Sequence, residues 1–152
     1  MTDPYKAGLF SGNPYYAKSD IEGHLVVVLQ GQLENRGLEL ISQISRCVLK
    51  NEIHELIATD ESGVGAGSKV NRVAYLGFME ISRAGVLTVG DEVWLNHQLI
   101  GTIAGFDETH MPNHINIIIS TVERRSGAES GFGLGEALSF RQARTAGWAP
   151  YF

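Results

Sequence analysis

The chain has 152 residues, a formal net charge of −5, 18 glycines and one cysteine, Cys47. This length suits one domain, and the acidic balance argues against a protein that binds nucleic acid through a basic face. A single cysteine excludes an internal disulfide and a cysteine-based zinc site. Because no run of 18 apolar residues and no signal-like N-terminus occur, we expect a soluble, cytoplasmic protein with no membrane partner.

Aromatic residues concentrate towards the two ends of the chain, which suggests an N-terminal arm (1–22), a single domain (23–142) and a C-terminal tail (143–152). Aromatic residues are depleted in disordered segments, so we expect the arm to dock on the body or on another subunit rather than to fray. The same residues predict a homo-oligomer. They are Tyr5, Phe10, Tyr15, Tyr16, Phe132, Trp148, Tyr151 and Phe152.

The apolar run in residues 24–31 predicts a strand covered on both faces. The spacing of the apolar residues then changes. Leu38, Ile41, Ile44 and Val48 lie three or four positions apart, which predicts one main helix over about 36–49, with Cys47 at its buried edge. A rival interpretation joins this helix to the flanking strands as a parallel, Rossmann-like βαβ unit over residues 24–60.

Residues 52–59 favour a strand with His54 facing solvent, and a glycine-rich loop follows at 60–69. Its glycines, Gly63, Gly65 and Gly67, can expose backbone N–H groups to an anion, with Ser68 and Lys69 behind them. A crossover loop without a ligand is the alternative, because the spacing does not match the Walker phosphate loop. The next predicted strand, 71–81, contains Gly77, which suggests a bulge or a close backbone approach.

Residues 82–89 are expected to form a turn into the central part of the chain, 90–120. There, three short runs with a period of two, at 92–95, 99–104 and 115–119, predict an antiparallel meander. Residues 136–142 are expected to add a closing strand. The fold expected from these elements is α+β, a small and mostly antiparallel β-barrel with one main helix and extended aromatic termini.

The second half of the chain resembles the β-barrel of the glucitol/sorbitol-specific IIA component of the sugar phosphotransferase system. The matching pieces are the turn Gly90-Asp91, the strand pair 93–95 and 100–104, Ala104-Gly105-Phe106, the loop 107–113, Asn113-His114-Ile115 and the closing segment 133–140. The resemblance implies a barrel. That family phosphorylates a histidine upstream of the Gly-Asp turn, but the corresponding stretch here, 75–79, contains none, so phosphotransfer is not expected.

The loop 107–114 gathers two imidazoles and two carboxylates, Asp107, Glu108, His110 and His114. These groups suit zinc, iron, nickel or manganese, so a divalent metal is a candidate cofactor. Pro112 disfavours a helix between the histidines, which would converge only through a turn. The alternative is a loop stabilised by side-chain-to-backbone hydrogen bonds, with Asp107 and Asn113 as caps.

The leading functional hypothesis is a small intracellular barrel that binds an anionic metabolite, carboxylated or phosphorylated, or serves as an accessory subunit. Its expected site lies between the loops 63–69 and 107–114, with Arg72 as a bidentate anion contact. The expected ligand-binding residues are Gly63, Gly65, Gly67, Ser68, Lys69, Arg72 and Asn113. A second hypothesis is a metal-assisted or acid–base lyase, isomerase or hydrolase using His110 and His114. A third is a purely structural oligomer component, so whether the protein is an enzyme stays open.

Overall fold

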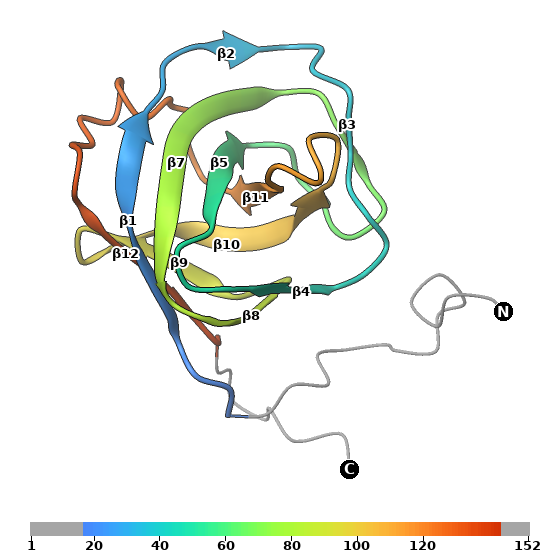
Figure 1. The fold of residues 1–152 in the computed structure, drawn as a ribbon. Helices are drawn as coiled ribbons and strands as arrows, with labels where there is room; N and C mark the ends of the chain where they lie inside the picture. The colour runs from blue at the N-terminus through green and yellow to red at the C-terminus, as the bar shows by residue number, and fades with distance from the viewer. Residues whose placement is uncertain (1–16, 144–152) are drawn as a thin grey trace, which may run out of the picture.

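The computed structural model describes residues 17–143, and within this range every regular element is a β-strand (Figure 1). No helix in this range is long and apolar enough to cross a membrane. The strands are β1 (Ile21–Val28), β2 (Gln32–Leu33), β3 (Leu38–Glu39), β4 (Ser45–Val48), β5 (Ile53–Thr59), β6 (Lys69–Val70), β7 (Val73–Arg83), β8 (Gly85–Thr88), β9 (Glu92–Leu95), β10 (Gln98–Asp107), β11 (Asn116–Ser120) and β12 (Ala137–Arg141).

Seven strands form a closed ring in the order β1-β12-β9-β10-β11-β5-β7, which closes because β1 pairs with both β12 and β7. The expected meander is present, since β9, β10 and β11 pair antiparallel in succession. The pairing of β5 with β11 is parallel. This pair joins two parts of the chain that are distant in sequence, and it builds the region that carries the candidate site.

Two apolar clusters lie on opposite faces of the ring. The larger one takes buried side chains from all seven strands, including Leu56 of β5, Phe106 of β10 and Phe140 of β12, so it fills the interior. The smaller cluster contains Ile57 and Ile118, which alternate with interior residues and therefore face outward. The short pair β3–β6 covers this outer cluster with Leu38 and Val70.

The predicted helix at 36–49, and with it the α+β class, is wrong. Leu38 lies in β3 and Val48 in β4, while the N–H of Ile41 donates to the carbonyl of Phe106 (2.8 Å). The backbone hydrogen bonds of this segment therefore go to distant strands, and this tertiary pairing overrides the local apolar spacing. The Rossmann-like alternative fails for the same reason.

Several smaller predictions also need correction. Residues 85–88, expected to be part of a turn, form β8, which pairs with β4. His54 is buried rather than facing solvent, and Cys47 is exposed rather than buried. Of the aromatic residues expected to support an oligomer, only Phe132 lies within 17–143, where it packs against the interior cluster. The arm residues up to 16 and the tail aromatics lie outside the described residues.

The expectation for Gly77 is confirmed. Its position on β7 faces the backbone of β1 so closely that a Cβ would collide with the carbonyl oxygen of Val27. The registers of both neighbouring strands shift beside this position, between Leu25 and Val27 on β1 and between Leu56 and Ile57 on β5. Such bulges increase local twist and help the ring to close.

Candidate metal-binding site

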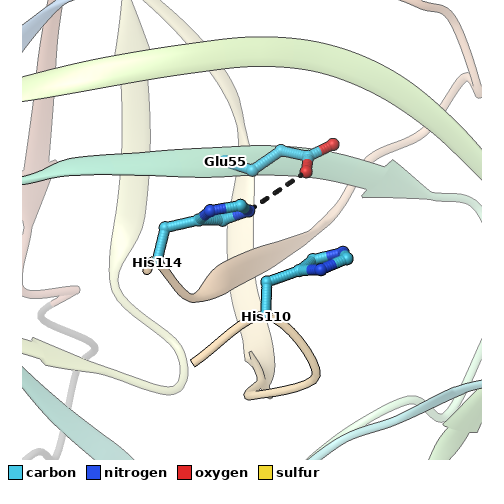
Figure 2. Close-up of side chains that lie close together, drawn as sticks. All are labelled: Glu55, His110 and His114. Atoms are coloured by element: carbon cyan, nitrogen blue, oxygen red, sulfur yellow. Dashed lines mark ion pairs between the residues drawn. The ribbon is translucent and has the colours of Figure 1, made fainter. Parts of the chain in front are cut away.

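Among the described residues, one group of three metal-ligating side chains comes together, formed by Glu55, His110 and His114. Glu55 lies on β5, on the outward face that it shares with Ile57. His110 lies in the loop between β10 and β11, and His114 comes two residues before β11. Because β11 runs parallel to β5 with Asn116 beside Glu55, the loop places both imidazoles next to the carboxylate (Figure 2).

The three groups face a common space in Figure 2, and one donor atom from each lies within 4.8 Å of the others. Nε2 of His114 is 3.6 Å from Oε1 of Glu55. The rings of His110 and His114 are stacked with centroids 5.0 Å apart, and Phe78 contacts His114 edge-on at 5.2 Å. A tetrahedral zinc ion would need donors about 3.4 Å apart, given bond lengths near 2.1 Å. His110 is exposed, so rotation of its side chain can provide this closure.

The loop that carries the histidines is held by hydrogen bonds to buried side chains. The carboxylate of Asp107 accepts from the backbone N–H and hydroxyl of Thr109 and from the amide of Asn116 (2.9–3.1 Å). Nδ1 of buried His54 accepts from the N–H of Ile115 at 3.1 Å. In the neutral ring the proton then lies on Nε2, which faces Glu52 at 3.1 Å. These contacts fix the backbone on both sides of His114.

Two of the groups that could bind a metal lack a close polar partner on the side that faces the site. Nε2 of His114 is shielded from solvent and has no such partner in the described part of the chain. The Glu55 side chain is 10% exposed, and its only polar contact there is the 3.6 Å approach of His114. Buried polar groups are normally hydrogen-bonded, so an unsatisfied pair needs an explanation. A bound cation would supply the missing partner for both groups.

Burial shifts the pKa values of these two groups in opposite directions. Burial raises the pKa of Glu55, and this is only partly offset by the charges of His110 and Arg36. Burial also lowers the pKa of His114, with further lowering by the charges of His110 and His54. His114 is therefore neutral at pH 7, which is the form in which an imidazole binds metal.

Asn113 contacts the other nitrogen of the His114 ring. Its amide nitrogen lies 2.7 Å from Nδ1, an arrangement that leaves the proton on Nε2. A metal on Nε2 would move the proton to Nδ1, and a turn of the Asn113 amide would then let its oxygen accept it. Asn113 can therefore orient the imidazole in either state.

The two acidic residues predicted as ligands within the loop do not join the group. Asp107 is buried, and both of its oxygens accept hydrogen bonds from Thr109 and Asn116. Glu108 forms an ion pair with Arg46 at 3.4 Å. The structure thus brings together His110 and His114 as predicted, and supplies the carboxylate from another strand.

The groups predicted to bind an anion in the glycine-rich loop are largely engaged within the protein. The N–H of Gly65 donates to the hydroxyl of Ser68 (3.0 Å), and the N–H of Gly67 donates to the carbonyl of Ile41 (2.9 Å). Gly63 has a positive φ of 71°, and Lys69 is exposed on β6. The N–H of Ile41 also donates to the carbonyl of Phe106, so Ile41 links the glycine-rich loop at Gly67 to the end of β10.

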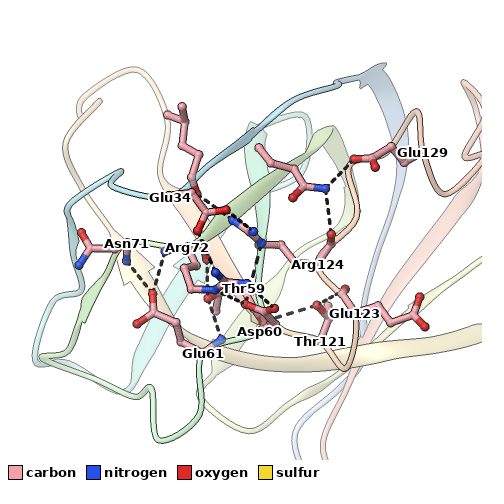
Figure 3. A network of polar contacts seen from close by, with 12 residues as sticks. Glu34, Thr59, Asp60, Glu61, Asn71, Arg72, Thr121, Glu123, Arg124 and Glu129 are labelled. Carbon is pink, nitrogen blue, oxygen red and sulfur yellow. Dashed lines mark hydrogen bonds and ion pairs between the residues drawn. The ribbon is translucent and has the colours of Figure 1, made fainter.

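Arg72 belongs to a network of ion pairs (Figure 3). Its guanidinium makes two contacts of 3.2 Å with the carboxylate of Asp60 and one of 2.8 Å with Glu34. Arg124 donates to the other carboxylate oxygen of Glu34 at 2.6 Å. The guanidinium of Arg72, predicted to bind an anionic ligand, is therefore already engaged by carboxylates of the protein itself.

Sequence reasoning missed Glu55. The signal that could have identified it is a carboxylate inside an apolar strand, at residues 53–59, because charged residues are seldom buried without a partner. Its partners could not be read from that strand, since they lie about 60 positions later in the chain.

The candidate site lies within the part of the chain that matches a known family model. The model of a family of unknown function (DUF6917) matches residues 15–141. No curated protein and no solved structure matches the chain. Because the family match covers most of the sequence, the protein belongs to this family of unknown function, DUF6917.

Proposed function

We propose that the protein binds a divalent transition-metal ion through Glu55, His110 and His114 and uses it in chemistry on a small molecule. The observation that carries this proposal is the buried, unpartnered Nε2 of His114, which faces a buried carboxylate and lies beside a second imidazole. Two imidazoles and one carboxylate suit zinc, ferrous iron, manganese or nickel.

The number of protein ligands favours a catalytic rather than a purely structural ion. Structural zinc sites have four protein ligands, whereas catalytic sites have three and keep a position for water or substrate. A metal held in this way can polarise a bound oxygen or lower the pKa of a bound water towards 7. Within the protein, His54 and Asp107 would hold the loop in place, and Asn113 would orient the His114 ring.

The experiment is a metal titration of the purified, chelator-treated protein by calorimetry with Zn²⁺, Mn²⁺ and, without oxygen, Fe²⁺. We expect one ion per chain. Changing even an outer residue of a metal site weakens binding about 10–100-fold, so His114→Ala should weaken it about 100-fold or more.

The matched control is His97→Asn. His97 is an exposed histidine in the turn between β9 and β10, and its positive φ of 64° is one that asparagine tolerates. This variant should bind the metal as the wild type does. Failure of the wild type to bind any of the three ions would refute the proposal and leave a metal-free pair, Glu55 and His114, as the acid–base alternative.

A further inference from the structure

Arg36 lies close to the candidate metal site but does not belong to its ligand set. Its backbone N–H donates to the carbonyl of Asn71, and its Nε donates to the hydroxyl of Tyr75, both at 3.0 Å. Tyr75 pairs with Ile57, and Phe78, which contacts His114, pairs with Glu55. Arg36 is therefore fixed over the same outward face of β5 and β7 that carries the site.

The guanidinium group of Arg36 uses only its Nε as a hydrogen-bond donor within the described residues. Among residues 17–143, no group accepts a hydrogen bond from its two terminal nitrogens. Its charge does reach the site, because it lowers the pKa of Glu55 against the effect of burial. A fixed, half-buried arginine with a free fork is suited to a planar anion.

The charges around the site also favour a single negative charge on the ligand. A divalent ion and Arg36 together outweigh Glu55 and Asp107 by one positive charge, while Arg46 and Glu108 neutralise each other as an ion pair. His54 hydrogen-bonds through both of its ring nitrogens, to Ile115 and Glu52. A monoanion would balance the remaining charge.

Resting on the proposed metal site, we infer that the small molecule is a carboxylate, bound between the open positions of the metal and the guanidinium of Arg36. A carboxylate presents two oxygens in the plane that the arginine fork matches, and its single charge completes the balance. Arg36 is then the residue that selects the class of substrate, and the Tyr75 hydroxyl positions it.

The test uses the protein loaded with Co²⁺, whose visible absorption reports changes at the metal, and pyruvate as the carboxylate probe. We expect pyruvate to change the spectrum. Arg36→Ala should weaken pyruvate binding about tenfold to a hundredfold, as expected for a lost charge-assisted hydrogen bond, and should not weaken Co²⁺ binding. Arg36→Lys, which keeps the charge but not the fork, should recover part of the loss.

Arg72→Ala serves as the matched control, because Arg72 is engaged with Asp60 and Glu34 and should not affect pyruvate. Equal pyruvate binding by wild type and Arg36→Ala, with Co²⁺ still bound, would overturn this inference and leave the metal proposal intact. Binding of inorganic phosphate but not pyruvate would overturn the choice of carboxylate. Failure of the wild type to bind Co²⁺ would overturn both proposals.

Discussion

Two polar regions on the outside of the ring differ in how their charges are satisfied. In the ion-pair network of Glu34, Asp60, Arg72 and Arg124, each carboxylate faces arginine nitrogens at 2.6–3.2 Å (Figure 3). In the cluster of Glu55, His110 and His114, the shortest ion-pair contact is 3.6 Å, and His114 Nε2 is buried without a hydrogen bond (Figure 2).

The pKa directions express the same contrast. The Arg124 hydrogen bond lowers the pKa of Glu34, and the Arg72 hydrogen bond lowers the pKa of Asp60, so ionisation of both is favoured by folding. Burial raises the pKa of Glu55, so its ionisation opposes folding. An ion-pair network that lowers the pKa values of its carboxylates stabilises the fold, whereas a cluster that costs stability is a candidate for function.

The largest stability effect should come from Arg124, the least exposed member of the network. Its side chain is 9% exposed and donates to the carbonyl of Leu33 (3.0 Å) and to Glu34 (2.6 Å). Arg124→Ala should lower the free energy of unfolding by about 2 kcal/mol, because charge-assisted hydrogen bonds are lost. Urea unfolding measures this change.

Arg125→Ala is the control for this experiment. Arg125 is 59% exposed and pairs only with Glu123 within the described region, so its loss should change stability by less than about 0.5 kcal/mol. Equal effects of the two variants would show that the network is not a stabilising element.

A smaller change in stability, of opposite sign, is expected when Glu55 is replaced. Glu55→Gln removes a charge that folding buries, so at pH 7 and without metal it should raise the melting temperature by about 2–4 °C. The cost of the charge is absent below the ordinary pKa of 4.5 and develops as the pH rises through that value towards the raised folded pKa. The gain in melting temperature should therefore vanish at acidic pH.

The same substitution should abolish tight metal binding, so stability and function respond in opposite directions. Thermal unfolding at pH 4 and pH 7, with and without Zn²⁺, measures both responses. A metal-free Glu55→Gln protein that is less stable at pH 7 would contradict the view that this carboxylate is held at a cost.

The smallest change in stability is predicted for replacement of Arg72. Arg72→Ala should leave metal and carboxylate binding unchanged and lower the melting temperature only slightly, because its ion pairs are exposed and screened by salt. Calorimetric titration and thermal unfolding check the two parts. Weaker ligand binding in this variant would instead support the anion site that the sequence places at the glycine-rich loop.

Local sequence patterns determined much of the strand content. The period-two runs at 92–95 and 99–104 lie in β9 and β10, and the run at 115–119 overlaps β11. The runs at 52–59 and 136–142 contain β5 and β12. Each of these signals lies within a few residues and needs no knowledge of the partner strand. The resemblance to the glucitol/sorbitol-specific component, the anionic metabolite and the homo-oligomer stay predictions.

Tertiary structure alone decided the conformation of the segment 36–49 and the third member of the candidate site. The apolar spacing of Leu38, Ile41 and Val48 indicates a helix, but distant strands take up the backbone hydrogen bonds of this segment. Histidines four positions apart marked the loop, whereas Glu55 joins them only because β5 and β11 pair in parallel. The periodicity of apolar residues indicates which faces of a segment are buried. Which distant residue lies beside a given position depends on strand pairing, which is a property of the whole chain.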